Sequence, residues 1–370
     1  MLGSALRWAA WNLRFAGQPG SRRALFPRDD SSGARILALE SIPGLLGPGW
    51  EETARDELQR ARRFGAGVLT IEDDGYPELL RLSSDPPPLL YVWGDLRPQD
   101  MLAIAVVGSR RATPHGVRVA HRVAKGAAGA GFTVVSGLAR GIDAASHRGA
   151  LEGGGRTLAV LGSGLDRIYP VEHLRLAEVI AGRGAVLSEF PFGTGPLPRH
   201  FPERNRVIAW LSWATVVVEA ADGSGSLITA GLAAEEGRLV HAVPGPAGAP
   251  EAAGTNALLR EGALVCRGWE DVLEDLAPQV VEAARAFAPA GAAVSGAPDG
   301  PARPRGDLCA SLSPEARRVL DLIPAVRGIG IERLGEGSRL APGPLLAILL
   351  DLELRGLVRQ LPGRRFLSRT

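Results

Sequence analysis

The feature that most constrains the fold is a regular alternation of short apolar runs and helical segments between residues 102 and 269. Apolar runs such as LAIAVVG and TLAVLG are continuous and end in glycine, as the buried strands of a parallel sheet do. Segments such as PHGVRVAHRVAKGAAGAG separate the runs and carry apolar residues at helical spacing. The alternation predicts an α/β fold with a doubly wound parallel sheet that helices cover on both faces.

The regions that flank this core differ from it in composition. Residues 1–33 are rich in arginine without a sustained period, which predicts a poorly ordered lead-in, and residues 34–99 predict a small helical N-terminal domain. The core is expected over residues 100–275. Residues 276–306 contain ten Ala, five Pro and four Gly, a composition that suits a flexible linker. In residues 307–370, three helical segments precede two short strands, which is the order of a winged-helix domain.

Composition and motifs exclude several classes of protein. The 370 residues include 42 basic and 40 acidic ones, so the chain is not a simple polycation. The two cysteines are far apart, which argues against a disulfide scaffold or a cysteine metal site. We expect a soluble, cytoplasmic protein, because the sequence has no apolar run of about 18 residues and no secretion signal. The sequence also lacks GxGxxG after the first strand, GxxxxGK[ST] and HExxH, so we expect no catalytic residue, metal or cofactor.

Four of the predicted strands end in turns of small residues. These turns are GSRR (108–111), SGLARG (136–141), GSGLD (162–166) and DGSGS (222–226). The carboxyl ends of parallel strands meet at one rim of a sheet, where helix N-termini attract anions. Four such turns in one sheet predict a rim that binds phosphate groups.

Basic residues cluster near the first of these turns. Six basic residues and no acidic residue occur between Met101 and Ile142. Arg118, Arg122 and Lys125 are interpreted as the solvated face of an amphipathic helix, whereas Arg110 follows the strand-end glycine and can grip a phosphate in a bidentate way.

The segment PLPRHFPERNRVIAWLS (196–212) places an aromatic residue among arginines. Stacking rings and cations are the means by which proteins bind single-stranded nucleic acid. The alternative is that the ring belongs to the core and that the arginines pair with Glu203 or with acids at the strand ends. Spacing alone leaves both interpretations open for Arg199, Phe201, Arg204, Asn205 and Arg206. The strand-end acids are expected to order loops or to accept hydrogen bonds from arginine; they are Asp143, Asp166, Glu189 and Glu219.

From about residue 100 to 270 the chain resembles the DNA-processing protein A (DprA/Smf) family. The resemblance rests on motifs in order and spacing, among them VVGSRRATPHG, SGLARGIDAASHRGAL, LSEFPFGTGPLPRHFPERNRVIAWLS and VVVEAADGSGSLITAGLAAEEGR. It implies an extended Rossmann-like core that forms a homodimer and binds single-stranded DNA. It also implies loading of the RecA recombinase during natural transformation, with no catalytic reaction. The tail resembles the winged-helix domain of the family, and residues 34–96 loosely resemble its small helical N-terminal domain.

The resemblance also implies roles for individual residues. Phosphate binding falls on Ser109 and Arg110, and the rim extends through Gly137 and Gly164. Base stacking falls on Phe201. The flanking residues of the implied site are Arg199, Arg204, Asn205, Arg206, Ser224, Gly225, Ser226 and Thr229.

The chain departs from the family pattern at two positions. Pro198 stands where many members have lysine, and the adjacent Arg199 is the candidate replacement. His173 stands where the family often has asparagine.

Two other functions compete with this interpretation. Lysine-decarboxylase-like phosphoribohydrolases share a similar core and carry a PGGxGTxxE loop; this chain has DGSGSLITA there, without the matching acid. The winged helix could instead read duplex DNA, although ten Arg against seven acids in residues 307–370 give it only a mild positive charge.

Overall fold

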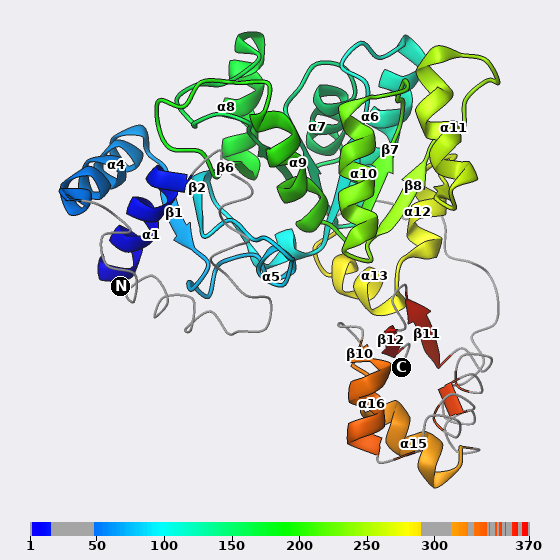
Figure 1. The fold of residues 1–370 in the computed structure, drawn as a ribbon. Coiled ribbons are helices and arrows are strands. Elements are labelled where there is room, and N and C mark those ends of the chain that lie inside the picture. Colours follow the sequence, from blue (N-terminus) through cyan, green and yellow to red (C-terminus); the bar gives the residue numbers. More distant parts are fainter. Residues whose placement is uncertain are drawn as a thin grey trace. The chain divides into compact units, whose positions relative to one another are not determined.

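The computed structural model describes residues 2–15 and 48–289 and much of the C-terminal part. In that part the described residues are 312–324, 329–338, 340, 345, 348, 349, 352, 357–361 and 365–368. The chain forms two compact units, shown in Figure 1: Met1–Glu274 with Ala286–Ala293, and Asp275–Arg285 with Val294–Thr370.

The first unit is built on a nine-stranded sheet, counted over the described residues, with the order β1-β2-β6-β5-β4-β3-β7-β8-β9. Every neighbouring pair from β6 to β9 is parallel, whereas β2 pairs antiparallel with β6 and β1 pairs antiparallel with β2. The strands are β1 (Gly67–Thr70), β2 (Leu89–Gly94), β3 (Ala103–Val107), β4 (Thr133–Ser136), β5 (Thr157–Val160), β6 (Ala185–Ser188), β7 (Ala214–Val217), β8 (Leu239–Ala242) and β9 (Leu264–Val265). The predicted parallel core is confirmed.

The order of the strands reverses at β3. The chain proceeds from β3 through β4 and β5 to β6, and then returns to the other side of β3 as β7, β8 and β9. Right-handed crossovers place the helices of the two halves on opposite faces of the sheet. Open α/β sheets bind their ligands at such a reversal, outside the carboxyl ends of the strands.

The helices pack in two groups that follow these halves. In the first half α6 (Pro114–Gly129) packs against α7 (Ile142–Glu152), and η2 (Val171–His173) leads into α8 (Leu174–Arg183). In the second half α9 (His200–Trp210) packs against α10 (Gly225–Glu235). The remaining elements of this unit are α1 (Leu2–Phe15), α4 (Trp50–Phe64), α5 (Glu78–Arg81), η1 (Pro98–Met101), η3 (Pro250–Ala252), α11 (Ala253–Arg260) and α12 (Trp269–Asp275).

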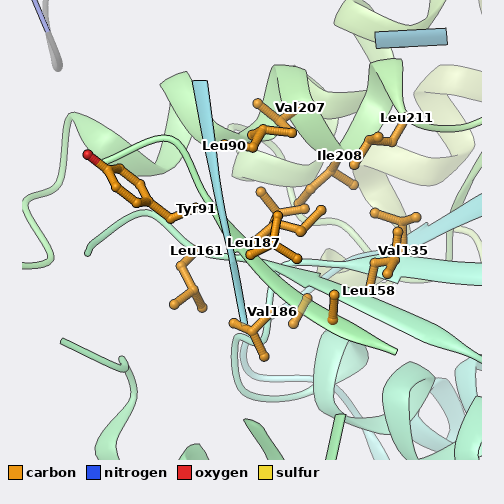
Figure 2. Close-up of a cluster of buried hydrophobic side chains, with 14 of the residues drawn as sticks. Leu90, Tyr91, Val135, Leu158, Leu161, Val186, Leu187, Val207, Ile208 and Leu211 are labelled. Carbon is orange, nitrogen blue, oxygen red and sulfur yellow. The ribbon is translucent and has the colours of Figure 1, made fainter. Parts of the chain in front are cut away.

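The apolar face of α9 anchors that helix on the sheet. Figure 2 shows Val207 and Ile208 of α9, and Leu211 directly after it, beside strand residues such as Leu158 and Leu187, and all five side chains are buried. Burying a side chain of this size contributes about 1.5–3 kcal/mol. The cluster therefore fixes α9, and with it the orientation of the polar residues on the preceding turns.

The described part of the N-terminal region is not a separate helical domain. The run LLYVW forms β2, which pairs with β6 of the core in the register Tyr91↔Ser188, and β1 adds to β2. An apolar extended run satisfies its backbone by pairing with a neighbouring strand, which explains why residues 48–99 join the sheet of the first unit. The prediction of a separate domain is wrong for these residues, and residues 34–47 lie outside the described ones.

The predicted disorder at the N-terminus is wrong for residues 2–15, which form α1. Trp8 and Trp11 stand three residues apart, are buried, and have ring centroids 6.3 Å from each other. The Asn12 side-chain amide donates a hydrogen bond to the carbonyl of Glu189 at 2.8 Å. The rest of the predicted lead-in, residues 16–33, lies outside the described residues.

The predicted linker also contains a helix. Residues Pro278–Arg285 form α13, in which Val280 and Ala284 are buried. Apolar residues four apart share one face of a helix, and burial of that face overrides the linker-like composition. The linker prediction is wrong for this segment, and residues 290–306 lie outside the described residues.

The second unit combines helices with a small antiparallel sheet. Besides α13 its described elements are α15 (Pro314–Asp321), β10 (Ile329–Gly330), α16 (Ile331–Ser338), β11 (Val358–Leu361) and β12 (Arg365–Ser368), with the strand order β10-β12-β11. Val319, Leu334, Leu352 and Phe366 are buried in its core. The two C-terminal strands agree with the prediction, while β10 was not predicted. Across the described residues of both units, no helix has the length and apolarity needed to cross a bilayer.

We expect Gly149→Ala to destabilise the first unit by about 1–3 kcal/mol, because a Cβ on this residue of α7 would overlap the backbone oxygen of His121 in α6. Gly129→Ala, at the end of α6, is the matched control, since a Cβ there meets nothing within 4 Å. Replacing a helical glycine by alanine is neutral or stabilising by up to about 1 kcal/mol. Urea unfolding measures both changes, and equal midpoints for the two variants would contradict the close packing of α6 on α7.

Candidate nucleic-acid interface

A cavity of about 640 Å³ opens at the carboxyl ends of β3 and β7, where the strand order reverses. Three segments far apart in the sequence supply most of its walls: the turn after β3, the first turns of α9, and the turn that leads into α10. Ala139, Asp143 and Tyr169 also line the cavity. Nine of the predicted site residues line it: Ser109, Arg110, Phe201, Arg204, Asn205, Ser224, Gly225, Ser226 and Thr229.

The N-terminus of α10 forms one wall. Ser224 caps the helix, and its hydroxyl contacts the amide of Ser226 at 3.4 Å and the hydroxyl of Ser226 at 2.9 Å. Gly223 before it has φ 70°, a conformation that favours glycine. A helix N-terminus presents amide groups without intrahelical partners and carries a partial positive charge. This wall can therefore accept an anion.

The turn after β3 forms the facing wall. The Ser109 amide donates to the carbonyl of Glu219 at 2.7 Å, and the Ser109 hydroxyl accepts a hydrogen bond from the Arg111 amide at 3.1 Å. That arrangement leaves the hydroxyl proton of Ser109 to donate. Arg110 is exposed, and its guanidinium forms no ion pair with any residue that the structure describes.

The Phe201 ring lies close to a cation and to a second ring. The Arg110 guanidinium carbon is 4.7 Å from the centroid of the Phe201 ring, and the Tyr169 ring is 5.8 Å away at an angle of 53°. A Cβ on Gly162 would lie 3.0 Å from the Phe201 ring, so glycine allows the ring to approach the turn after β5. Phe201 is half-buried rather than in the core. The group offers a stacking surface next to a cation.

The Arg204 guanidinium is buried beneath this surface. It donates to the carbonyl of Gly137 at 2.7 Å and to that of Val160, at the ends of β4 and β5. Burial lowers the pKa of Arg204 to about 10, while the nearby Asp143 opposes that change. The side chain thus remains charged at neutral pH.

Position 137 requires glycine, since a Cβ there would lie 2.6 Å from the Arg204 guanidinium nitrogens. It does not line the main cavity. Together with Tyr169 and Arg140, it lines an adjoining hollow of about 100 Å³.

Asn205 links α9 to the wall formed by the N-terminus of α10. Its side-chain amide donates to the carbonyl of Gly225 at 3.1 Å, and its side-chain oxygen accepts from the Arg204 Nε at 3.2 Å. The residue therefore positions the first turn of α10 relative to the buried arginine.

Three of the predicted site residues line neither space. Arg206 is buried, pairs with Glu189 and donates to the carbonyl of Asp85 at 2.8 Å, which favours the alternative of pairing with acids. Gly164 shapes a loop, since its amide donates to the carbonyl of Thr194 at 2.9 Å. Arg199 is exposed outside the lining, whereas its neighbour Pro198 lines the cavity.

The acids near the rim hold loops in place, as the sequence predicted. The Asp143 carboxylate accepts hydrogen bonds from the amides of Gly137 and Ala139, and burial raises its pKa. The Glu219 carboxylate accepts from the amide of Thr113 at 2.9 Å and from its hydroxyl.

His173 has a similar loop-holding role. The residue is buried, with its Nδ1 2.8 Å from the carbonyl of Leu138, so it fixes the turn after β4. The departure from asparagine at this position therefore affects the scaffold of the rim rather than the cavity lining.

Sequence reasoning gave no site role to Tyr169, which lines the cavity, whereas Arg111 and Asp222 belong to the predicted GSRR and DGSGS turns. Tyr169 carried a usable signal, because it is an aromatic residue a few positions after the glycine turn that follows β5.

Comparison with known proteins identifies the family. The sequence model described as DNA recombination-mediator protein A matches residues 67–277, and that of the DprA winged-helix domain matches residues 302–364. The chain belongs to the DNA recombination-mediator protein A family. The predicted family is thus confirmed, as are the Rossmann-like core and the C-terminal winged-helix domain of the DprA fold.

Relatives of this family cover most of the chain. It is 38% identical to protein Smf of Escherichia coli K12 over 298 residues, which is 80% of this chain and 76% of that protein. It is 43% identical to the DNA processing protein DprA of Streptococcus pneumoniae over 207 residues, which is 56% of this chain and 73% of that protein.

Two solved DprA structures share the fold. The structure from Streptococcus pneumoniae has a TM-score of 0.62 at 34% identity, over 73% of this chain and 98% of that chain. The structure from Helicobacter pylori, reported for its single-stranded DNA binding mode, has a TM-score of 0.51 at 31% identity, over 55% of this chain and 93% of that chain.

We expect Arg206→Met to destabilise the first unit by about 3–5 kcal/mol, because it removes the ion-pair partner of a Glu189 side chain that is only 1% exposed. Arg199→Met is the control, since that exposed residue should change the free energy of unfolding by less than about 0.5 kcal/mol. Urea unfolding measures both. A stable Arg206→Met protein with weakened DNA affinity would instead assign Arg206 to the binding surface.

Proposed function

We propose that this recombination mediator binds single-stranded DNA in the cavity at the rim of the sheet and loads RecA onto the bound strand. The observation that carries the proposal is the pairing of the exposed Arg110 with the Phe201 ring, opposite the N-terminus of α10. Phosphate binding and base stacking are thereby available in one cavity of about 640 Å³.

The phosphate would lie between Arg110, the Ser109 hydroxyl and the first turn of α10. Arginine offers a planar set of donors that matches two phosphate oxygens. The amides of the helix N-terminus add about 0.3–1 kcal/mol for an anion at the surface. The buried charge of Arg204 adds to the positive potential on the floor of the cavity.

The neighbouring base would stack on the Phe201–Tyr169 group. Stacking tolerates any sequence, because every base presents a π face. The sugar-phosphate contacts carry no sequence information either. We therefore propose binding without marked sequence preference, as a protein that acts on strands of any sequence requires.

The mediator role draws on the family. The Helicobacter pylori relative is described by its single-stranded DNA binding mode, and the cavity of this chain supplies the chemistry for the same ligand class. We propose that the protein acts as a homodimer in the cytoplasm, with RecA as partner, in natural transformation. We propose no catalytic step, which agrees with the engagement of Asp143 and Glu219 in loop hydrogen bonds.

We expect Arg110→Ala and Phe201→Ala each to weaken binding of an oligothymidine by about 1–3 kcal/mol. The salt slope is the slope of the logarithm of the binding constant against the logarithm of the salt concentration. Arg110→Ala should reduce its magnitude by about 0.7, since one phosphate contact is lost, whereas Phe201→Ala should leave it unchanged. Fluorescence anisotropy across a salt series measures both. Arg175→Ala is the control, because its side chain is 95% exposed on α8. Wild-type affinity in the Arg110→Ala/Phe201→Ala double variant would reject the assigned site.

We expect the wild-type protein to speed RecA filament assembly on strands coated with single-strand-binding protein. The Arg110→Ala/Phe201→Ala variant should not do so, because loading requires the bound strand. The rate of RecA ATP hydrolysis on coated DNA measures assembly. If the wild-type protein binds the strand but leaves this rate unchanged, the RecA role is wrong and the DNA site stands.

A further inference from the structure

A stripe of exposed basic side chains follows α6 away from the cavity. We define the basic stripe as Arg111, His115, Arg118, Arg122 and Lys125, all of which are exposed. The members on α6 are spaced by three and four residues, so they share one face of the helix. The opposite face is buried, so the basic stripe is the solvent face of α6.

The basic stripe begins at the site described above. Arg111 lines both the cavity and the adjoining hollow, and α6 starts three residues later. The neighbouring helix α7 also starts at the rim, where the Ile142 amide donates to the carbonyl of Ser109 at 3.2 Å. Gly149 lies against His121, and Gly153 lies against Lys125, so α6 and α7 run in the same direction away from the rim (Figure 1).

The charge of the basic stripe is mostly uncompensated within the described residues. Glu152 of α7 contacts Lys125 at 2.5 Å and His121 at 2.8 Å. Arg111, Arg118 and Arg122 form no ion pair with any residue that the structure describes.

Arg148 extends this basic surface onto α7. It stands one helical turn before Glu152 and is itself exposed, without a described ion-pair partner. A helix face that serves only solubility usually carries both acidic and basic side chains. This face is almost entirely basic, with Glu152 as its acidic neighbour.

The spacing of these side chains fits a phosphate backbone. An α-helix rises 1.5 Å per residue, so Arg118 and Arg122 are separated by about 6 Å along the axis. On α6 the cations Arg118, Arg122 and Lys125 follow one another at about 4.5–6 Å along the axis, which is comparable with the phosphate repeat of an extended single strand.

We propose that the basic stripe binds the sugar-phosphate backbone of the same single strand where it leaves the cavity. The proposal rests on the proposed function and adds a second segment to its DNA path. The occupant is a polyanion rather than a protein, because stable protein interfaces need an apolar centre and the members of this face are charged.

The test compares a short strand with a long one. An oligothymidine of about 5 nucleotides lies near the lower end of the usual range of single-strand sites, and one of about 20 exceeds that range. Only the longer one reaches from the cavity along α6. The variant is Arg118→Gln/Arg122→Gln. The matched control is Arg62→Gln/Arg63→Gln, which removes two exposed charges from α4, the helix that packs beside β1.

We expect the α6 variant to bind the 5-mer as the wild type does, and to bind the 20-mer about tenfold more weakly at about 50 mM salt. Its salt slope for the 20-mer should decrease by about 1.4, which corresponds to two lost phosphate contacts. The control should bind both strands as the wild type does.

Three results would overturn the proposal. Unchanged affinity of the variant for the 20-mer would show that the strand does not follow α6. An equal loss for both lengths would assign the effect to the cavity. A loss of binding to polyglutamate with unchanged DNA binding would identify a surface for an acidic protein. Failure of the proposed function is a separate outcome, in which the wild type binds neither oligothymidine.

Discussion

The buried guanidinium of Arg204 is the contact on which the rim of the sheet depends. It joins the carbonyl groups at the ends of β4 and β5, and through Asn205 it connects to the first turn of α10. A buried charge is costly unless hydrogen bonds satisfy it. Here the carbonyls of Gly137 and Val160 accept those bonds, and the nearby charge of Asp143 favours the charged guanidinium. Because one side chain holds the carboxyl ends of two strands and, through Asn205, a helix N-terminus, the geometry of the cavity depends on this buried contact rather than on its exposed outer residues.

The two helix N-termini at the reversal of the strand order differ in whether a carboxylate already contacts them. The N-terminus of α6 already holds an anion, since the Glu219 carboxylate contacts the cap residue Thr113 and fills the space next to Gly116. The N-terminus of α10 is capped only by the neutral Ser224. The positive end of α10 therefore remains available, and an anion entering the cavity is directed toward that wall and toward Arg110.

The sequence allowed the parallel core and most of the cavity lining to be predicted, because apolar runs that meet glycine carry a local signal. It did not separate Arg204 from Arg206, which lie two residues apart on α9. Their roles depend on partners from distant segments, the strand-end carbonyls for one and Glu189 with Asp85 for the other. Spacing cannot show which distant group meets a side chain. For the same reason α1 was missed, since the burial of Trp8 and Trp11 becomes evident only when the fold is complete.

The antiparallel pairing of β2 with β6 has a consequence for how the chain can be divided. The family resemblance suggests a minimal fragment that starts near residue 100, but such a fragment would leave one side of β6 with unpaired amide and carbonyl groups. An open edge of this kind templates association with other chains. The segment from β1 to β2 therefore covers this edge of the core, and a fragment intended to stay monodisperse has to begin before Gly67.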